Sequence, residues 1–125
     1  GHSQGGGFAL EATRRRPEAV VAVVALEPSG APQVVDAAVG SASPAHLYVW
    51  GDRIADHPIW QRYRASVDAH ASALRAAGVR VDVCDLPREG LKGNSHFPMM
   101  DRNSDAVAAR VLAWLDTIEP PVPAT

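Results

Sequence analysis

The 125-residue sequence contains one cysteine, Cys84, and it lacks long apolar runs and any large excess of charge of one sign. A single cysteine excludes a disulfide within the chain, and we expect Cys84 to be a small buried apolar group. The formal net charge of -2, without a basic cluster, argues against nucleic acid or an anionic membrane as a partner. No stretch approaches the roughly 18 apolar residues of a membrane span. These features do not indicate a cellular compartment.

Motifs for metals and nucleotides are missing as well. The histidines and acidic residues show no HExxH or paired-ligand spacing. The glycine-rich start GHSQGGG has neither the GxGxxG order nor the lysine of a phosphate-binding loop. The sequence therefore predicts no metal and no organic cofactor, and it argues against a nucleotide-binding protein.

The pattern of apolar residues predicts an α/β fold. With 46% hydrophobic residues, the composition is typical of one modest globular domain. Residues 20–27, VVAVVALE, are apolar up to the final Glu27, which predicts a central strand buried on both faces of a parallel sheet. Residues 46–50 predict a second strand, and the alternating residues 79–87 predict a third strand nearer an edge. Helices are expected over residues 4–15, 58–77 and 104–118. Strands that alternate with helices predict a mostly parallel sheet flanked by helices.

Two long segments and the end of the chain are predicted to be irregular. Residues 28–45 are rich in Pro, Gly, Ser and Ala and show no period, which predicts a loop too short for a helical cap domain. A second loop is expected between the third strand and the last helix. Residues 120–125 form a Pro-rich tail without residues that would join a core.

The first residues, GHSQG, match the Gly-x-Ser-x-Gly pattern of a nucleophile elbow. Glycines on either side of Ser3 are expected to let the backbone turn tightly from a strand into a helix and expose the hydroxyl. The backbone N–H of Gln4, at the start of that helix, would then face an oxyanion. The pattern also occurs by chance in glycine-rich loops, so a nucleophilic Ser3 requires partners elsewhere in the sequence.

A serine hydroxyl needs a base, and the base needs an acid that orients it. Among the five histidines, His96 lies in the loop before the last helix, where loops at the carboxyl ends of parallel strands form sites. We therefore predict His96 as the base. His46 starts a strand, and His57 and His70 lie at or within a helix, which predicts packed or solvated side chains. His2 is held in the elbow, and we expect it to line the substrate pocket.

Three acidic residues are candidates for the acid. Glu27 follows the apolar run directly, and Pro28 is expected to hold it in an extended conformation. Asp52 and Asp56 follow the next strand. We expect Asp52 to accept backbone N–H groups of its own turn. The residues alone leave the choice among the three open.

As a set, GHSQGG, VALEPSG, VWGDRIADHPIW and GNSHFPMMDRN resemble the C-terminal half of the α/β-hydrolase fold. More narrowly, they are similar to a branch of bacterial carboxylesterases whose triad acid is a glutamate after the strand that follows the elbow. The resemblance covers nearly the whole chain. It implies a partial domain over residues 1–119 that begins at the elbow, followed by the tail at 120–125.

The resemblance also implies an activity and its residues. It places the nucleophile at Ser3, the acid at Glu27 and the base at His96, for cleavage of small carboxylic esters through an acyl-enzyme. It favours Glu27 because the usual aspartate position falls on Ile54. A thioesterase, lactonase or amidase of the same fold, or a non-catalytic binding module, remains an alternative.

Two further expectations follow from the resemblance. The strands that precede the elbow in this fold, and the loop that supplies a second oxyanion donor, form an N-terminal half that would have to complete the domain. We expect residues 1–125 alone to be aggregation-prone and inactive. The site should be uncovered on the side of residues 28–45, and we expect its lining to include Trp60, Phe97, Met99 and Met100.

Overall fold

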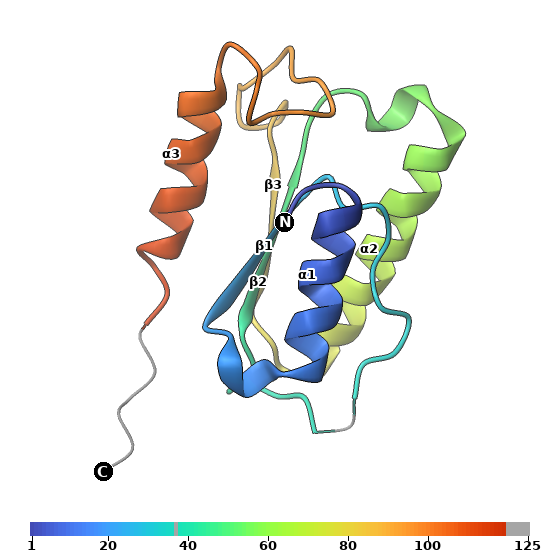
Figure 1. Cartoon of the computed structure of the whole chain (residues 1–125), viewed down its shortest axis with the longest axis vertical. Helices are drawn as coiled ribbons and strands as arrows, with labels where there is room; N and C mark the ends of the chain where they lie inside the picture. The colour runs from blue at the N-terminus through green and yellow to red at the C-terminus, as the bar shows by residue number, and fades with distance from the viewer. Residues whose placement is uncertain (37, 120–125) are drawn as a thin grey trace.

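The computed structural model of the chain describes residues 1–36 and 38–119. In chain order its elements are α1 (Gln4–Arg15), the short 3-10 helix η1 (Pro17–Ala19), β1 (Ala22–Leu26), β2 (Ala45–Trp50), η2 (Ile54–Asp56), α2 (Pro58–Ala76), β3 (Val81–Asp85) and α3 (Ser104–Leu115). The three strands form a parallel sheet in the order β1-β2-β3, with helices on both sides (Figure 1). The predicted α/β architecture is therefore confirmed. The predicted Pro-rich tail at 120–125 lies outside the described residues.

Among the described residues, β2 is the middle strand of the sheet, and β1, the strand predicted to be central, lies at one end of the order. All six residues of β2 are buried, and the strand pairs with β1 on one side and β3 on the other. β1 alternates between half-buried and buried residues, and its outer edge meets a short extended segment at His2. The apolar run at 20–27 reflects two apolar faces, because helices pack on both sides of the sheet, but it carries no information on strand neighbours. β3 lies at the other edge, as predicted.

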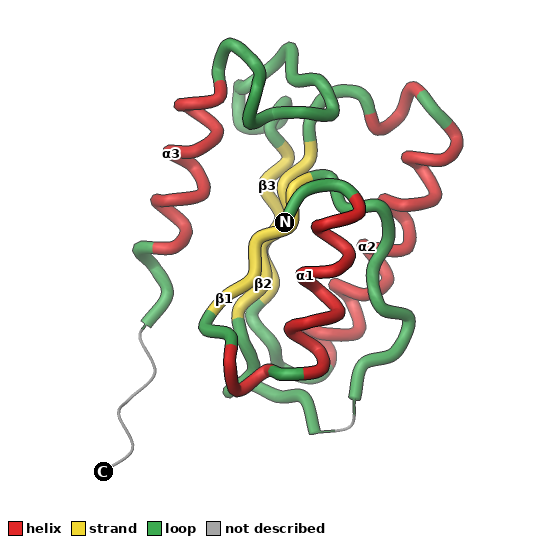
Figure 2. Tube along the Cα trace, in the orientation of Figure 1, coloured by secondary structure: helices red, strands yellow, loops and turns green. Residues whose placement is uncertain are grey.

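The core is divided into two layers by the alternation of side chains along each strand. One face of the sheet packs against α1 and α2, with buried residues Leu10, Val23, Ala25, Tyr48, Trp50, Val67, Ala71, Leu74, Val79 and Val81. The other face packs against α3, with buried residues Ala45, Leu47, Val49, Cys84, Leu86, Val107 and Trp114. Figures 1 and 2 show α3 on one side of the strands and α1 with α2 on the other.

The α3 side of the molecule leaves apolar surface uncovered. On α3 itself, Leu112 is 60% exposed and Leu115 is 38% exposed. A groove of about 420 Å³ runs between β1 and α3, and its lining includes Leu26 and Val111. No helix among the described residues is long and apolar enough to cross a membrane. Soluble monomers rarely leave large contiguous apolar patches in water, so this face is a candidate for contact with more protein.

Of the three glycines at the start of α1, Gly6 allows the predicted close packing, whereas Gly5 and Gly7 have room for a side chain. A Cβ at Gly6 would lie 3.0 Å from the Cβ of Pro28, whereas a Cβ at Gly5 would meet nothing within 4 Å. Helix α3 ends at Leu115 rather than at residue 118, because the N–H of Ile118 donates to the carbonyl oxygen of Leu115 in a tighter turn.

The loops that follow the three strands meet at the carboxyl ends of the sheet. Figure 2 shows the long loop after β3 arching over this end, beside the loop that follows β2. The segment between β1 and β2 contains no helix in its described residues, 28–36 and 38–44. This agrees with the expectation that the segment is too short to form a helical cap over the site. This end of a parallel sheet is where open α/β folds bind their ligands.

Candidate active site

Ser3 lies in a tight turn between a short extended segment and α1. The N–H of Ser3 donates to the carbonyl oxygen of Leu26 at 2.9 Å, and the N–H of Leu26 donates to that of Gly1 at 2.8 Å. Ser3 then takes φ 55° and ψ -123°, a strained conformation for a residue with a side chain. A Cβ at Gly1 would lie 2.2 Å from the carbonyl oxygen of Gly5. Of the two glycines in the motif, only Gly1 is therefore required by lack of space.

The hydroxyl of Ser3 faces the imidazole of His96. The distance from Ser3 Oγ to His96 Nε2 is 2.9 Å, and His96 Nδ1 lies 3.1 Å from Oε1 of Glu27. When Glu27 is ionised, its carboxylate only accepts hydrogen bonds, so Nδ1 carries the hydrogen. In the neutral imidazole, Nε2 is then the acceptor for the serine hydroxyl. The structure thus brings together the three residues that the sequence proposed, although Ser3 and His96 are 93 positions apart.

Glu27 reaches His96 from the end of β1 and is 1% exposed. Its second oxygen, Oε2, accepts the N–H of Gly51 at 3.1 Å, and a Cβ at Gly51 would lie 2.7 Å from this oxygen. Burial raises the pKa of the Glu27 carboxyl above its ordinary value, whereas the hydrogen bonds from His96 and Gly51 act to lower it. The backbone of Glu27 has φ 41°, so the extended conformation predicted from Pro28 is wrong. The turn after β1 aims the side chain at the elbow instead.

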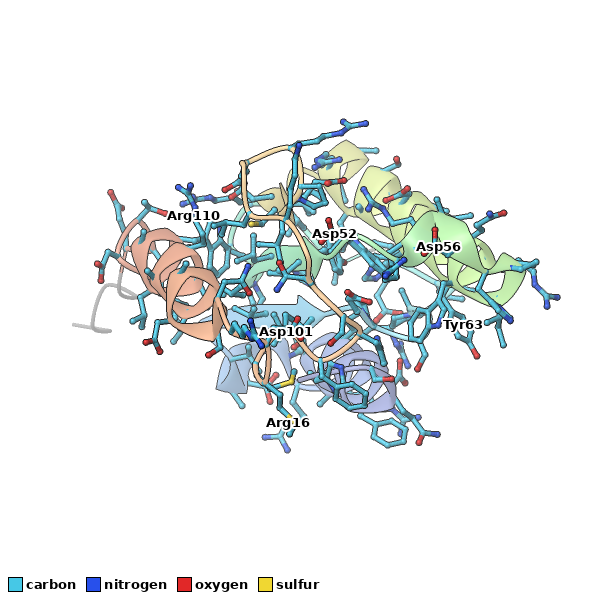
Figure 3. The ribbon with its side chains drawn as sticks, turned by 90° about the horizontal axis from the view of Figure 1, so that it is seen from above. Arg16, Asp52, Asp56, Tyr63, Asp101 and Arg110 are labelled. Atoms are coloured by element: carbon cyan, nitrogen blue, oxygen red, sulfur yellow. The ribbon has the colours of Figure 1, made fainter. Side chains whose placement is uncertain are left out.

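The other two candidate acids do not contact the imidazole. Asp52 Oδ2 accepts the N–H of Asn94 at 2.8 Å, in the loop that carries His96 and not in its own turn as predicted. Asp56 forms an exposed ion pair with Arg53 at 3.0 Å. Figure 3 looks down on this end of the molecule, with Asp52 near the strand ends and Asp56 farther out at the start of α2. Of the three candidates, Glu27 is the one whose carboxylate contacts the His96 imidazole.

Polar side chains fix the loop that carries His96, and the sequence reasoning missed them. Asp101 accepts the N–H of Ser95 at 2.8 Å and its hydroxyl at 2.7 Å, and these bonds hold the pKa of Asp101 below its ordinary value. The amides of Asn94 and Asn103 exchange hydrogen bonds of 2.7 and 3.0 Å. The available signal was the cluster of polar residues on both sides of the histidine in GNSHFPMMDRN.

Aromatic rings surround the imidazole of His96. The ring centroids of Trp60, His2 and Phe97 lie 4.1, 4.6 and 5.2 Å from that of His96. His2 also donates from Nε2 to the backbone carbonyl oxygen of His96 at 2.6 Å. Phe97 is 50% exposed and Trp60 is half-buried, so both present ring surface beside the base.

The two methionines expected in the pocket lie apart from these rings. Met99 lines the groove between β1 and α3, and Met100 is 79% exposed. Within the described residues, no ring contact or hydrogen bond connects either side chain to His96. Their role in a substrate pocket stays a prediction.

The remaining histidines have structural positions. Nδ1 of His70 lies 2.8 Å from the hydroxyl of Tyr48, and burial lowers the pKa of His70 to about 4, with a smaller effect of nearby His46. His57 accepts the N–H of Ile59 at 3.2 Å and so caps α2. In the part of the chain that the structure describes, no group of three or more His, Cys, Asp or Glu side chains is arranged to hold a metal ion.

Gln4 occupies the first position of α1, directly after Ser3. The first N–H groups of a helix have no acceptor within the helix, and they form a partial positive charge at its start. The N–H of Gln4 is therefore available to a negatively charged atom bound near Ser3.

Comparison with known proteins shows that the chain is similar to an esterase and to a probable lipase. No protein-family model matches the sequence. A probable secreted lipase, phiG, from Fungal sp. (strain ATCC 74256) is 42% identical over 45 residues, which are 36% of this chain and 12% of the lipase. A solved structure described as a novel bacterial esterase matches with a TM-score of 0.85 and 34% identity, over 94% of this chain and 36% of the esterase. The chain thus spans about a third of the length of that esterase. The match confirms the predicted α/β-hydrolase fold.

Proposed function

We propose that this chain carries the nucleophile, base and acid of a serine hydrolase that cleaves carboxylic esters. The observation that supports this most directly is the continuous hydrogen-bonded path from Ser3 Oγ through His96 to the carboxylate of Glu27. A serine in a strained elbow, a base at 2.9 Å and a buried acid behind it are the parts that nucleophilic attack requires. The likeness to an esterase and to a lipase favours an ester as the substrate.

Acylation would proceed as follows. Ser3 Oγ attacks the carbonyl carbon of the ester while its proton moves to His96 Nε2, and the carbonyl oxygen becomes an oxyanion. The buried charge of Glu27 stabilises the imidazolium and keeps the hydrogen on Nδ1. When the tetrahedral intermediate collapses, the bond to the alcohol oxygen breaks and Nε2 returns the proton to that oxygen. The alcohol leaves, and an acyl group remains on Ser3.

Deacylation repeats these steps with water as the nucleophile. His96 Nε2 takes a proton from the water, the water oxygen attacks the acyl carbon, and the proton passes to Ser3 Oγ as the acid leaves. In both halves the N–H of Gln4 donates to the oxyanion. Oxyanion sites generally use more than one hydrogen-bond donor. The proposed enzyme therefore needs another N–H group, from outside the described residues, to stabilise the oxyanion.

The proposed catalytic unit therefore includes a further protein segment. Among the residues that the structure describes, the outer edge of β1 meets only the short segment around His2, and apolar side chains are exposed beside it. Parallel strands are normally covered on both faces, and open edges attract other chains. A segment that pairs with β1 would cover this edge and could supply the second donor. Without it, we expect residues 1–125 to aggregate and to be inactive on model esters.

The nucleophile is tested in the full natural protein. In Ser3→Ala we expect turnover of a short p-nitrophenyl ester to fall at least about 10⁴-fold and labelling by a fluorophosphonate to disappear. Ser41→Ala is the matched control, because Ser41 is exposed in the loop before β2 and should leave both readouts unchanged. A Ser3→Ala protein with normal turnover would end the serine-hydrolase proposal.

A further inference from the structure

His2 connects the two parts of the candidate site that come from opposite ends of the sequence. Its Nε2 lies 2.6 Å from the backbone carbonyl oxygen of His96, 94 positions away. A carbonyl oxygen only accepts, so Nε2 of His2 carries a hydrogen and donates it. The chemical steps proposed for Ser3, His96 and Glu27 make no use of this bond.

The hydrogen bond from His2 holds His96, whose imidazole must contact both Ser3 and Glu27. Asp52 and Asp101 hold the loop at Asn94 and Ser95, before the base. His2 holds the backbone of His96 itself. The imidazole must keep two contacts at once, 2.9 Å to the serine and 3.1 Å to the glutamate. A shift of about 1 Å in such an arrangement can cost about 10²-fold in rate.

His2 is well fixed at its own end. Its backbone forms a parallel bridge with Leu26, between the hydrogen bonds made by Gly1 and Ser3. Its ring packs against those of His96 and Phe97, with centroid separations of 4.6 and 5.0 Å. The elbow that presents the nucleophile therefore also fixes the donor that holds the base, and movement of the elbow would carry both groups together.

We propose that His2 is a positioning residue: its Nε2–H holds the carbonyl oxygen of His96 so that the imidazole stays in reach of Ser3. This inference rests on the proposed roles of Ser3 and His96. His2 acts through the base, which differs from the pocket-lining role expected from the sequence. Because His96 serves both acylation and deacylation, loss of the bond slows both steps.

Two substitutions in the full natural protein separate the hydrogen bond from the ring. His2→Gln keeps an N–H donor at similar reach and removes the ring, whereas His2→Phe keeps the ring and removes the donor. We expect His2→Phe to lower kcat on a p-nitrophenyl ester about 10- to 100-fold, with KM changed less than about twofold, in acylation and deacylation alike. His2→Gln should stay within about threefold of wild type.

Several outcomes would overturn the proposal. Equal losses in both variants would assign the effect to ring packing, and a rise in KM alone would make His2 a pocket residue. Thermal unfolding shows whether His2→Phe folds; if it does not, His2→Leu is the second donor-free variant and carries the same prediction. Ser3→Ala separates the two proposals, because a fully active His2→Phe beside an inactive Ser3→Ala refutes the role of His2 alone.

Discussion

The segment after β1 and the segment after β2 each place a carboxylate at the carboxyl end of the sheet, and both carboxylates act on the loop that carries His96. Glu27 is buried and contacts the imidazole itself at 3.1 Å. Asp52 is half-buried and accepts a backbone N–H of the loop at 2.8 Å. The first carboxylate lies against a ring nitrogen of His96, whereas the second accepts a hydrogen bond from the backbone of the loop. In the proposed mechanism, only the first would stabilise a ring that gains a proton.

The difference arises from the strand that each residue follows. β1 lies beside the extended segment that leads to Ser3, so the turn after it opens next to the elbow. β2 lies one strand farther away, and the turn after it reaches the start of the His96 loop instead. Two acidic residues that each follow a strand therefore differ in their contacts because their strands differ in place in the sheet.

The largest difference in turnover between the two carboxylates is expected from Glu27→Gln. The amide keeps the shape of the side chain but loses the charge that stabilises the imidazolium and selects its tautomer. We expect kcat of the full protein to fall about 10³- to 10⁴-fold, the size of loss known for a triad aspartate changed to asparagine. The matched change Asp52→Asn keeps an acceptor oxygen and should stay within about threefold. If Asp52→Asn is crippling and Glu27→Gln is mild, the assignment of the acid is wrong.

The second-largest effect on turnover is expected from a substitution at Gly51, which lies after β2 and contacts the side chain of Glu27. A Cβ there would lie 2.7 Å from Oε2 of Glu27 and 3.1 Å from the Cβ of Asn94. We expect Gly51→Ala to lower the free energy of unfolding by about 1–3 kcal/mol in urea titrations and to reduce turnover at least about tenfold.

Gly7→Ala in α1 is the control for that substitution, since its Cβ would meet its nearest neighbour at 3.6 Å. An alanine in a helix with room for its side chain should be neutral or stabilising by up to about 1 kcal/mol. A Gly51→Ala protein as stable and active as wild type would show that the contact between the two segments is looser than 2.7 Å implies.

Removal of the Asp52 acceptor should have a moderate effect. In Asp52→Ala the N–H of Asn94 loses its partner, the His96 loop loosens, and we expect turnover to fall about tenfold. Asp56→Ala breaks only an exposed ion pair with Arg53 and should leave turnover unchanged. Steady-state kinetics of the two variants test this, and equal losses would contradict a specific role for Asp52.

The smallest effect concerns stability and pH. Burial raises the pKa of Glu27, so the native state binds this proton more tightly than the unfolded chain does. The ionised carboxylate therefore costs stability that is absent at low pH and appears as the pH rises through the folded pKa. We expect Glu27→Gln to raise Tm by a few degrees near neutral pH, with the difference disappearing as the pH falls towards 4.5. A Tm difference that does not change with pH would contradict this assignment.

The fold was largely predictable because its signals are local. Helices α1 and α2 lie within one residue of their predicted ends, because the spacing of apolar residues along a helix is a local signal. The neighbours of each strand were less predictable, because the valines of β1 indicate two covered faces and do not show which strands lie beside it.

The site was predictable in part for the same reason. Ser3 and His96 could be proposed from a motif and a loop, but residues alone did not separate Glu27 from Asp52. The contacts of Gly51, Asn94 and His2 arise where the elbow, the turn after β2 and the loop after β3 come together. No local sequence pattern predicts contacts between segments so far apart in the chain. The positive φ of Glu27 also runs against the extended conformation expected before a proline.

Positive φ at a residue with a side chain bears on how this position changes in evolution. Ser3 and Glu27 are the two residues with side chains that have positive φ in the described part of the chain, at 55° and 41°. Glycine adopts such angles without steric cost, so a protein of this fold that no longer needed to cleave esters would gain stability by drifting to glycine at either position. Persistence of serine and glutamate at these two strained positions would then distinguish active enzymes from inactive descendants among sequences that share the fold.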